Sequence, residues 1–165
     1  MSRPRNEPVQ ALKARRDAAL TRLVEGVPFI RFLGVRFERM GDELTARLVF
    51  SDKIIGGVTG AFLEIAAQME LAWHGVWARM EAGGPQAEAI ERGEFPPMPK
   101  TVDFTVDYLR SGLPRDAYAR AVINRAGRRY ASVSVEAWQD QRGRPFAAAT
   151  GHFVMPELSG GGEAP

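Results

Sequence analysis

The sequence contains no cysteine and only two histidines, His74 and His152. The absence of cysteine excludes disulfides, thiolate metal ligands and a thiol nucleophile, and it is compatible with the reducing cytoplasm in which we expect the protein to act. The histidines lack the spacing of metal ligands, so we expect no metal site. No apolar run approaches the roughly 20 residues of a membrane-spanning helix. The first residues, MSRPRNEP, have no apolar segment behind their charges, so we do not expect a signal peptide.

An excess of charge is also missing. The 22 basic and 20 acidic residues leave a net charge of only +2. Nucleic-acid binding needs clustered excess positive charge, so this balance argues against nucleic acid as the main partner. With 165 residues, of which 45% are hydrophobic, the chain is long enough to bury the core of one globular domain.

The first third of the chain predicts a helix and a β-hairpin. Apolar residues recur at helical spacing after Pro8, with Asn6 as the expected cap, and the helix is expected to end at Gly26. Residues 29–50 alternate with period two on either side of a turn at 40–43, which is typical of a hairpin.

The rest of the chain predicts one long helix and four strands. Residues 56–81 predict a helix that is apolar on nearly all sides, which is typical of a buried helix. Residues 82–99 are rich in Gly and Pro and predict an exposed connection with one helical turn near Ala87–Glu91. Four alternating segments follow over 100–155, separated by turn residues.

This order predicts an α+β fold, because antiparallel strands that follow one another need a segregated helix to cover them. An antiparallel β-sheet wrapped around a long central helix is the hotdog fold. We therefore expect an N-terminal helical extension at 1–27, a hotdog domain at 28–156 and a disordered tail at 157–165.

One motif and three shorter segments resemble a known family. In residues 55–64, IGGVTGAFLE, a Gly-Gly pair is followed by Glu64, seven residues after Gly57. This resembles the His-Gly-Gly motif of hotdog acyl-CoA thioesterases of the phenylacetyl-CoA and 4-hydroxybenzoyl-CoA branches, in which Asp or Glu has that spacing. Three further segments resemble the same family in the same order: TVDFTVDYLR (101–110), NRAGRRYA (124–131) and AAATGHFVM (147–155).

The resemblance implies hydrolysis of an aromatic or medium-chain acyl-CoA thioester. The residue types present are compatible with this reaction. The chain has no cysteine and no Gly-x-Ser-x-Gly motif, so a carboxylate is the available catalytic group. Glu64, in the second predicted turn of an apolar helix, is the candidate general base or nucleophile; an ion pair with a neighbouring subunit is the alternative. Gly56 and Gly57 would form the oxyanion hole at the helix N-terminus, although a plain flexible cap has the same sequence.

Further candidates are less specific. Gln68 lies one turn after Glu64 on the same helix face and would position water or the carboxylate, or else contact a subunit. Arg110, Arg128 and Arg129 are candidates for the phosphates of coenzyme A, since arginine suits phosphate, although such arginines are often only solvated. Acyl-CoA is then the substrate, and no cofactor is expected.

The motif departs from the family at Ile55, where a His is frequent. This departure supports an alternative function, a non-catalytic hotdog protein that binds acyl-CoA as a sensor or carrier. A hotdog dehydratase is disfavoured, because neither His has the required spacing to an acid. We expect a homodimer or a dimer of dimers. The resemblance implies that the glycines and Glu64 of one site come from different subunits.

Overall fold

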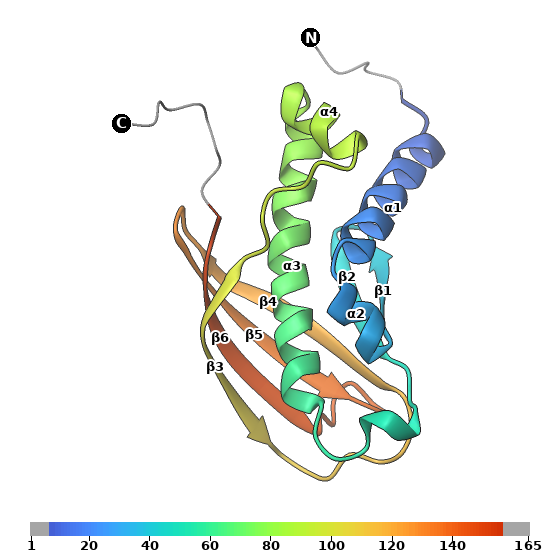
Figure 1. Ribbon diagram of the computed structural model, residues 1–165, viewed down its shortest axis with the longest axis vertical. Coiled ribbons are helices and arrows are strands. Elements are labelled where there is room, and N and C mark those ends of the chain that lie inside the picture. The colour runs from blue at the N-terminus through green and yellow to red at the C-terminus, as the bar shows by residue number, and fades with distance from the viewer. Residues whose placement is uncertain (1–6, 157–165) are drawn as a thin grey trace.

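A single antiparallel sheet and one long helix dominate the computed structural model, which describes residues 7–156 (Figure 1). The sheet order is β1-β2-β4-β5-β6-β3. Its strands are β1 (Val35–Met40), β2 (Glu43–Leu48), β3 (Lys100–Tyr108), β4 (Ala117–Ala126), β5 (Tyr130–Trp138) and β6 (Ala147–Val154). The helices are α1 (Val9–Glu25), α2 (Pro28–Leu33), α3 (Thr59–Ala82) and α4 (Pro85–Glu91), with a short 3₁₀ helix η1 (Asp52–Ile54).

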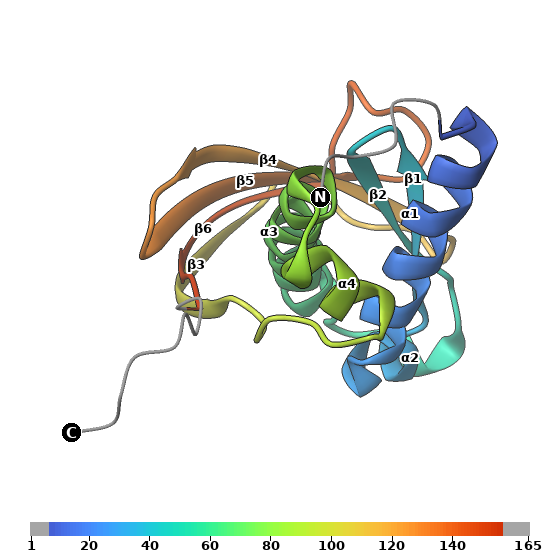
Figure 2. The same cartoon turned by 90° about the horizontal axis from the view of Figure 1, so that it is seen from above.

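Helix α3 lies along the concave face of the sheet, as the view from above shows (Figure 2). Its side chains at Phe62, Met69 and Trp73 are completely buried. Alternate residues of the strands, including Val133 and Val135, turn toward the same core. The curved antiparallel sheet around one buried helix confirms the α+β class and the hotdog fold that the sequence predicts.

The first strand of the predicted hairpin begins later than expected, because residues 28–33 form helix α2. Pro28 fits the first helical turn, where its missing N–H costs nothing. Gly34 ends the helix in the left-handed conformation, with φ +77°, and its N–H donates to the carbonyl of Ile30. The hairpin itself is confirmed, since Met40 pairs with Glu43 across the predicted turn.

The central helix also begins later than predicted, at Thr59 rather than at Gly56. Gly56 and Gly57 have φ values of +107° and +136°, which no residue adopts within a right-handed helix. They form the turn between η1 and α3 instead. Within residues 7–156, none of the helices is long and apolar enough to cross a membrane.

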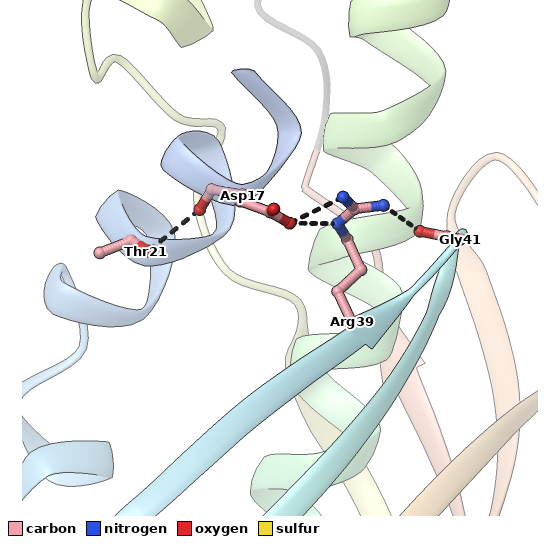
Figure 3. Close-up of polar contacts among 4 residues, drawn as sticks. All are labelled: Asp17, Thr21, Arg39 and Gly41. Atoms are coloured by element: carbon pink, nitrogen blue, oxygen red, sulfur yellow. Dashed lines mark hydrogen bonds and ion pairs between the residues drawn. The ribbon is translucent and has the colours of Figure 1, made fainter. Parts of the chain in front are cut away.

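Helix α1 is fastened to the end of β1 and to α3. Arg39, whose side chain is only 5% exposed, donates two hydrogen bonds to Asp17, at 2.7 and 2.9 Å, and one to the carbonyl of Gly41 (Figure 3). The guanidinium of Arg16 lies 3.5 Å from the ring centre of Trp77 on α3. These contacts hold α1 beside the sheet. The predicted cap Asn6 and the predicted tail at 157–165 lie outside the described residues.

Candidate active site

The carboxylate of Glu64 is held at the edge of the sheet. Glu64 lies in the second turn of α3, where it is half-buried. Its Oε1 accepts a hydrogen bond of 2.6 Å from the hydroxyl of Thr101, the second residue of the edge strand β3. This hydrogen bond fixes the position of one carboxylate oxygen of the half-buried Glu64.

Gln68 extends this contact by one helical turn. Its Nε2 donates to the carbonyl of Pro99 at 3.0 Å and lies 3.5 Å from the hydroxyl of Thr101. Thr101 is therefore held between Glu64 and Gln68, and the start of β3 is joined to α3 at two points. The predicted grouping of Glu64 with Gln68 on one helix face is what the structure shows.

Thr101 is a site residue that the sequence did not single out. It opens the segment TVDFTVDYLR, which carries part of the family resemblance, so one signal was available. The chain separation of 37 residues between Glu64 and Thr101 hid the contact, because no local spacing relates a helix to a later strand.

The glycine pair lies just before α3. Among the described residues, the N–H groups of Gly56 and Gly57 have no hydrogen-bond acceptor. A Cβ at either position would meet no atom within 4 Å, so positive φ rather than crowding in this chain accounts for glycine here. Two such N–H groups beside a helix N-terminus are suited to bind a developing negative oxygen.

Ile55 precedes this turn and is 68% exposed. It follows directly on η1, with an extended backbone. An apolar side chain therefore lies beside the candidate oxyanion hole, at the position where the resembled motif has a His.

The three candidate arginines lie at two opposite ends of the sheet. The N–H of Arg110 donates to the carbonyl of Phe146, just before β6, whereas the carbonyl of Arg129 accepts from Met155, just after it. Strand β6 rises by about 3.3 Å per residue, so its eight residues separate the two ends by roughly 23 Å. Arg110 and the pair Arg128 and Arg129 cannot bind one phosphate within a single chain.

A second acid of α3 has an unusual environment. Burial raises the pKa of Glu70 to about 7, partly offset by the N–H of Leu44 and the charge of Arg120. His74, one turn later, is exposed. The pair falls on the side of α3 that faces β2, away from the contact between Glu64 and Thr101.

Comparisons with known proteins identify the family of the chain. Residues 51–154 match a family model described as the acyl-CoA thioesterase N-terminal domain. The match covers more than half of the chain and includes the glycine pair, Glu64 and Thr101. The chain belongs to this acyl-CoA thioesterase family. No curated protein matches the sequence.

Several solved structures share the fold of this thioesterase-family protein. A protein from Chromobacterium violaceum is 33% identical with a TM-score of 0.64, covering 91% of this chain and 99% of its own. A phenylacetic acid degradation-related protein from Ralstonia eutropha is 21% identical, with a TM-score of 0.57 and coverage of 83% and 99%. A Bacillus halodurans protein solved with CoA is 16% identical, with a TM-score of 0.58 and coverage of 94% and 98%.

The edge strand of this thioesterase-family protein is open. Strand β3 pairs with β6 on one side only and ends the sheet. Val102 and Tyr108 are exposed along it, and so is Leu109, which follows its last residue. A nine-residue edge strand with exposed apolar side chains is a template for pairing with another chain.

Proposed function

We propose that this protein is a cytoplasmic homodimeric thioesterase that hydrolyses an aromatic or medium-chain acyl-CoA. Glu64 is the general base or nucleophile, and the N–H groups of Gly56 and Gly57 bind the oxyanion. The hydrogen bond from Thr101 to Glu64 carries the proposal, because it holds one oxygen of this carboxylate at the edge of the sheet.

Glu64 and the two glycine N–H groups are sufficient for every proton transfer and bond change in the reaction. As a general base, Glu64 takes a proton from water, and the hydroxide formed attacks the thioester carbonyl. The tetrahedral oxyanion is stabilised by the N–H groups of Gly56 and Gly57. Collapse of this intermediate breaks the carbon–sulfur bond, and the proton held by Glu64 passes to the departing CoA thiolate. As a nucleophile, Glu64 would instead attack the thioester carbonyl and expel the CoA thiolate, which breaks the carbon–sulfur bond and leaves an acyl anhydride. Water then hydrolyses the anhydride to the free acid and the Glu64 carboxylate, and the proton released passes to the thiolate.

An antiparallel dimer would assemble the complete site. If two β3 strands pair at their open edges, the Thr101 end of one meets the Tyr108 end of its partner. In each chain the Tyr108 hydroxyl lies close to Gly60, since a Cβ added to Gly60 would be 3.7 Å from the hydroxyl oxygen. The dimer would therefore bring Glu64 of one subunit toward the start of α3, and so toward the glycine turn, of the other.

Ile55 supports an apolar acyl group. Its exposed side chain lies next to the glycine turn, so an aliphatic or aromatic group would bury it at a gain of about 25 cal/mol per Å² of apolar surface removed from water. A charged acyl group would gain nothing there.

The same residue favours a second candidate, a non-catalytic acyl-CoA sensor or carrier, because a His that would orient water is absent from the motif. Thiol release from benzoyl-, phenylacetyl- and octanoyl-CoA, measured beside calorimetric binding of each, separates the two. Release at a rate well above that of buffer supports the thioesterase. Tight binding without release supports the sensor, and neither binding nor release contradicts both.

A further inference from the structure

A small pocket opens against the C-terminal half of α3. Its volume is about 40 Å³, which gives room for about three water molecules, or for a carboxylate group and the first carbons behind it. Its walls come from α3, from the end of α1, and from the segments just before β3 and just after β6. These walls are mostly apolar and include Leu23, Leu71, Val76, Pro97, Pro99 and Met155.

Arg79 is the one charged residue among the described residues that line this pocket. Its side chain is partly buried, and its Nη1 donates to the carbonyl of Gly75 at 2.8 Å. Within residues 7–156, no acidic side chain lies within ion-pairing distance of Arg79. Burial lowers the pKa of Arg79 below its ordinary value. Because a guanidinium stays protonated all the same, this part of the chain holds a partly buried positive charge without a counterion.

Gly75 allows the guanidinium of Arg79 to lie along the helix. A Cβ added to Gly75 would be only 2.9 Å from Nη1 of Arg79, which is closer than a carbon and a nitrogen atom pack without a bond. Glycine weakens a helix relative to alanine, yet residue 75 lies well inside α3. The pair of Gly75 and Arg79, one helical turn apart, therefore places the donor fork of the guanidinium at the wall of the pocket.

A single guanidinium among apolar walls selects the chemical class of the ligand. Its planar donor fork matches a carboxylate, which accepts two parallel hydrogen bonds from it. The apolar walls favour a carbon chain behind that carboxylate. A phosphate dianion fits less well, because one arginine balances only one of its charges and the other would lose its hydration against apolar side chains.

The pocket is distinct from the proposed catalytic site. Fifteen residues of α3 separate Glu64 from Arg79, a distance of about 22 Å along the helix axis at about 1.5 Å per residue. The proposed reaction uses neither Arg79 nor Gly75. A ligand in this pocket is therefore bound in addition to the acyl-CoA and does not take its place.

We propose that this pocket binds a small organic monocarboxylate, whose carboxylate pairs with Arg79 and whose apolar chain lies against Val76 and Pro97. The proposal stands on the pocket and does not depend on thioester hydrolysis. If the chain does hydrolyse an acyl-CoA, the acid that it releases belongs to the same chemical class, and the pocket is a second site for that acid.

Binding of butyrate, measured by calorimetry and by the shift in Tm, tests the proposal. The wild type should bind butyrate, and its Tm should rise with butyrate concentration, because a ligand of the folded chain stabilises it. Butyramide has the same size without the charge and should bind at least ~10-fold more weakly, as should inorganic phosphate. Arg79→Met should also weaken butyrate binding at least ~10-fold.

Three further variants locate the site. Arg125→Met removes an exposed arginine of β4 and is the matched control for net charge. Glu64→Gln is the control for binding at the catalytic site. Both should bind butyrate as the wild type does. Gly75→Ala should keep α3 intact, because alanine favours a helix, and should weaken butyrate binding by displacing the guanidinium of Arg79.

Several outcomes would overturn the proposal. They are the absence of butyrate binding to the wild type, equal binding in Arg79→Met and the wild type, and loss of binding in Glu64→Gln. Butyramide or phosphate bound as tightly as butyrate would show that the pocket does not recognise a carboxylate.

The chain itself offers a competing carboxylate. Glu157 follows Pro156, which lines the pocket. Butyrate binding that appears only in Glu157→Gln would identify this glutamate as the occupant in place of a free acid, and would overturn the proposal. Because all of these are binding measurements, a wild type that binds butyrate through Arg79 but hydrolyses no thioester would contradict the proposed function alone.

Discussion

Thr101 donates a 2.6 Å hydrogen bond to Oε1 of Glu64 and thereby joins the edge strand to the central helix. The hydroxyl does not itself meet the reacting atoms, so Thr101 is a positioning residue in the proposed mechanism. Its contribution should be visible in turnover rather than in substrate binding.

Thr101→Val should lower kcat about 10-fold with little change in KM, because loss of this hydrogen bond frees the carboxylate to leave its reactive orientation. Thr101→Ser keeps the hydroxyl and should restore most of the rate. Steady-state kinetics of the two variants are the measurement. Equal kcat values for the Val and Ser variants would show that the hydrogen bond is structural only.

The sequence predicted the parts of this site that are local and missed those that are not. Glu64 and Gln68 share a helix, so their common face follows from helical spacing. Thr101 reaches them only through the tertiary packing of β3. The predicted start of α3 was wrong because glycine adopts negative and positive φ about equally well. The sequence therefore does not reveal that Gly56 and Gly57 have positive φ and lie outside the helix.

Helix α2 was missed for a different reason. Its six residues, PFIRFL, are too few for a helical period to be distinguished from an alternating one. The long central helix and the four later strands carry enough residues for their periods to be unambiguous, which is why the hotdog fold itself was predicted.

Ile55→His should raise turnover of a benzoyl-CoA and of a medium-chain acyl-CoA, since a positioned imidazole would donate to the thioester or orient the water. The side chain is exposed, so the substitution should leave the fold intact. Kinetics on both substrates, with Ile55→Gln as the control for polarity alone, provide the check. If turnover falls or stays level on both, residue 55 does not occupy the functional position of the motif His.

Val102→Glu should dissociate the proposed dimer, because it places a charge on the open edge of β3. Val122→Glu is a matched control: both valines are 57% exposed, but Val122 lies on the interior strand β4. Sedimentation equilibrium at micromolar concentration should find a monomer for the first variant and a dimer for the second. A wild type that sediments as a monomer would rule out the shared site.

Glu70 should make stability depend on pH. Its pKa of about 7 in the folded chain lies above its ordinary value of 4.5, so the stabilisation is fully present below pH 4.5 and is lost as the pH rises through 7. The free energy of unfolding should fall by up to roughly 3 kcal/mol across this range through Glu70.

Glu70→Gln, which stays neutral, should remove that fall. Urea denaturation at pH 5 and pH 8 measures the change in the free energy of unfolding. Glu136→Gln, at an exposed position, is the control and should show the same pH dependence as the wild type. The same pH dependence in Glu70→Gln and in the wild type would place its origin in another group.

The central claim is that Glu64 is the catalytic carboxylate of a thioesterase, and thiol release by Glu64→Gln tests it most directly. The amide keeps the size of the side chain and its ability to accept from Thr101, so the circular dichroism spectrum and Tm should match those of the wild type. On the best acyl-CoA of the panel, kcat should fall at least ~100-fold, as for loss of a general base or nucleophile. Turnover by Glu64→Gln at the wild-type rate would contradict the account.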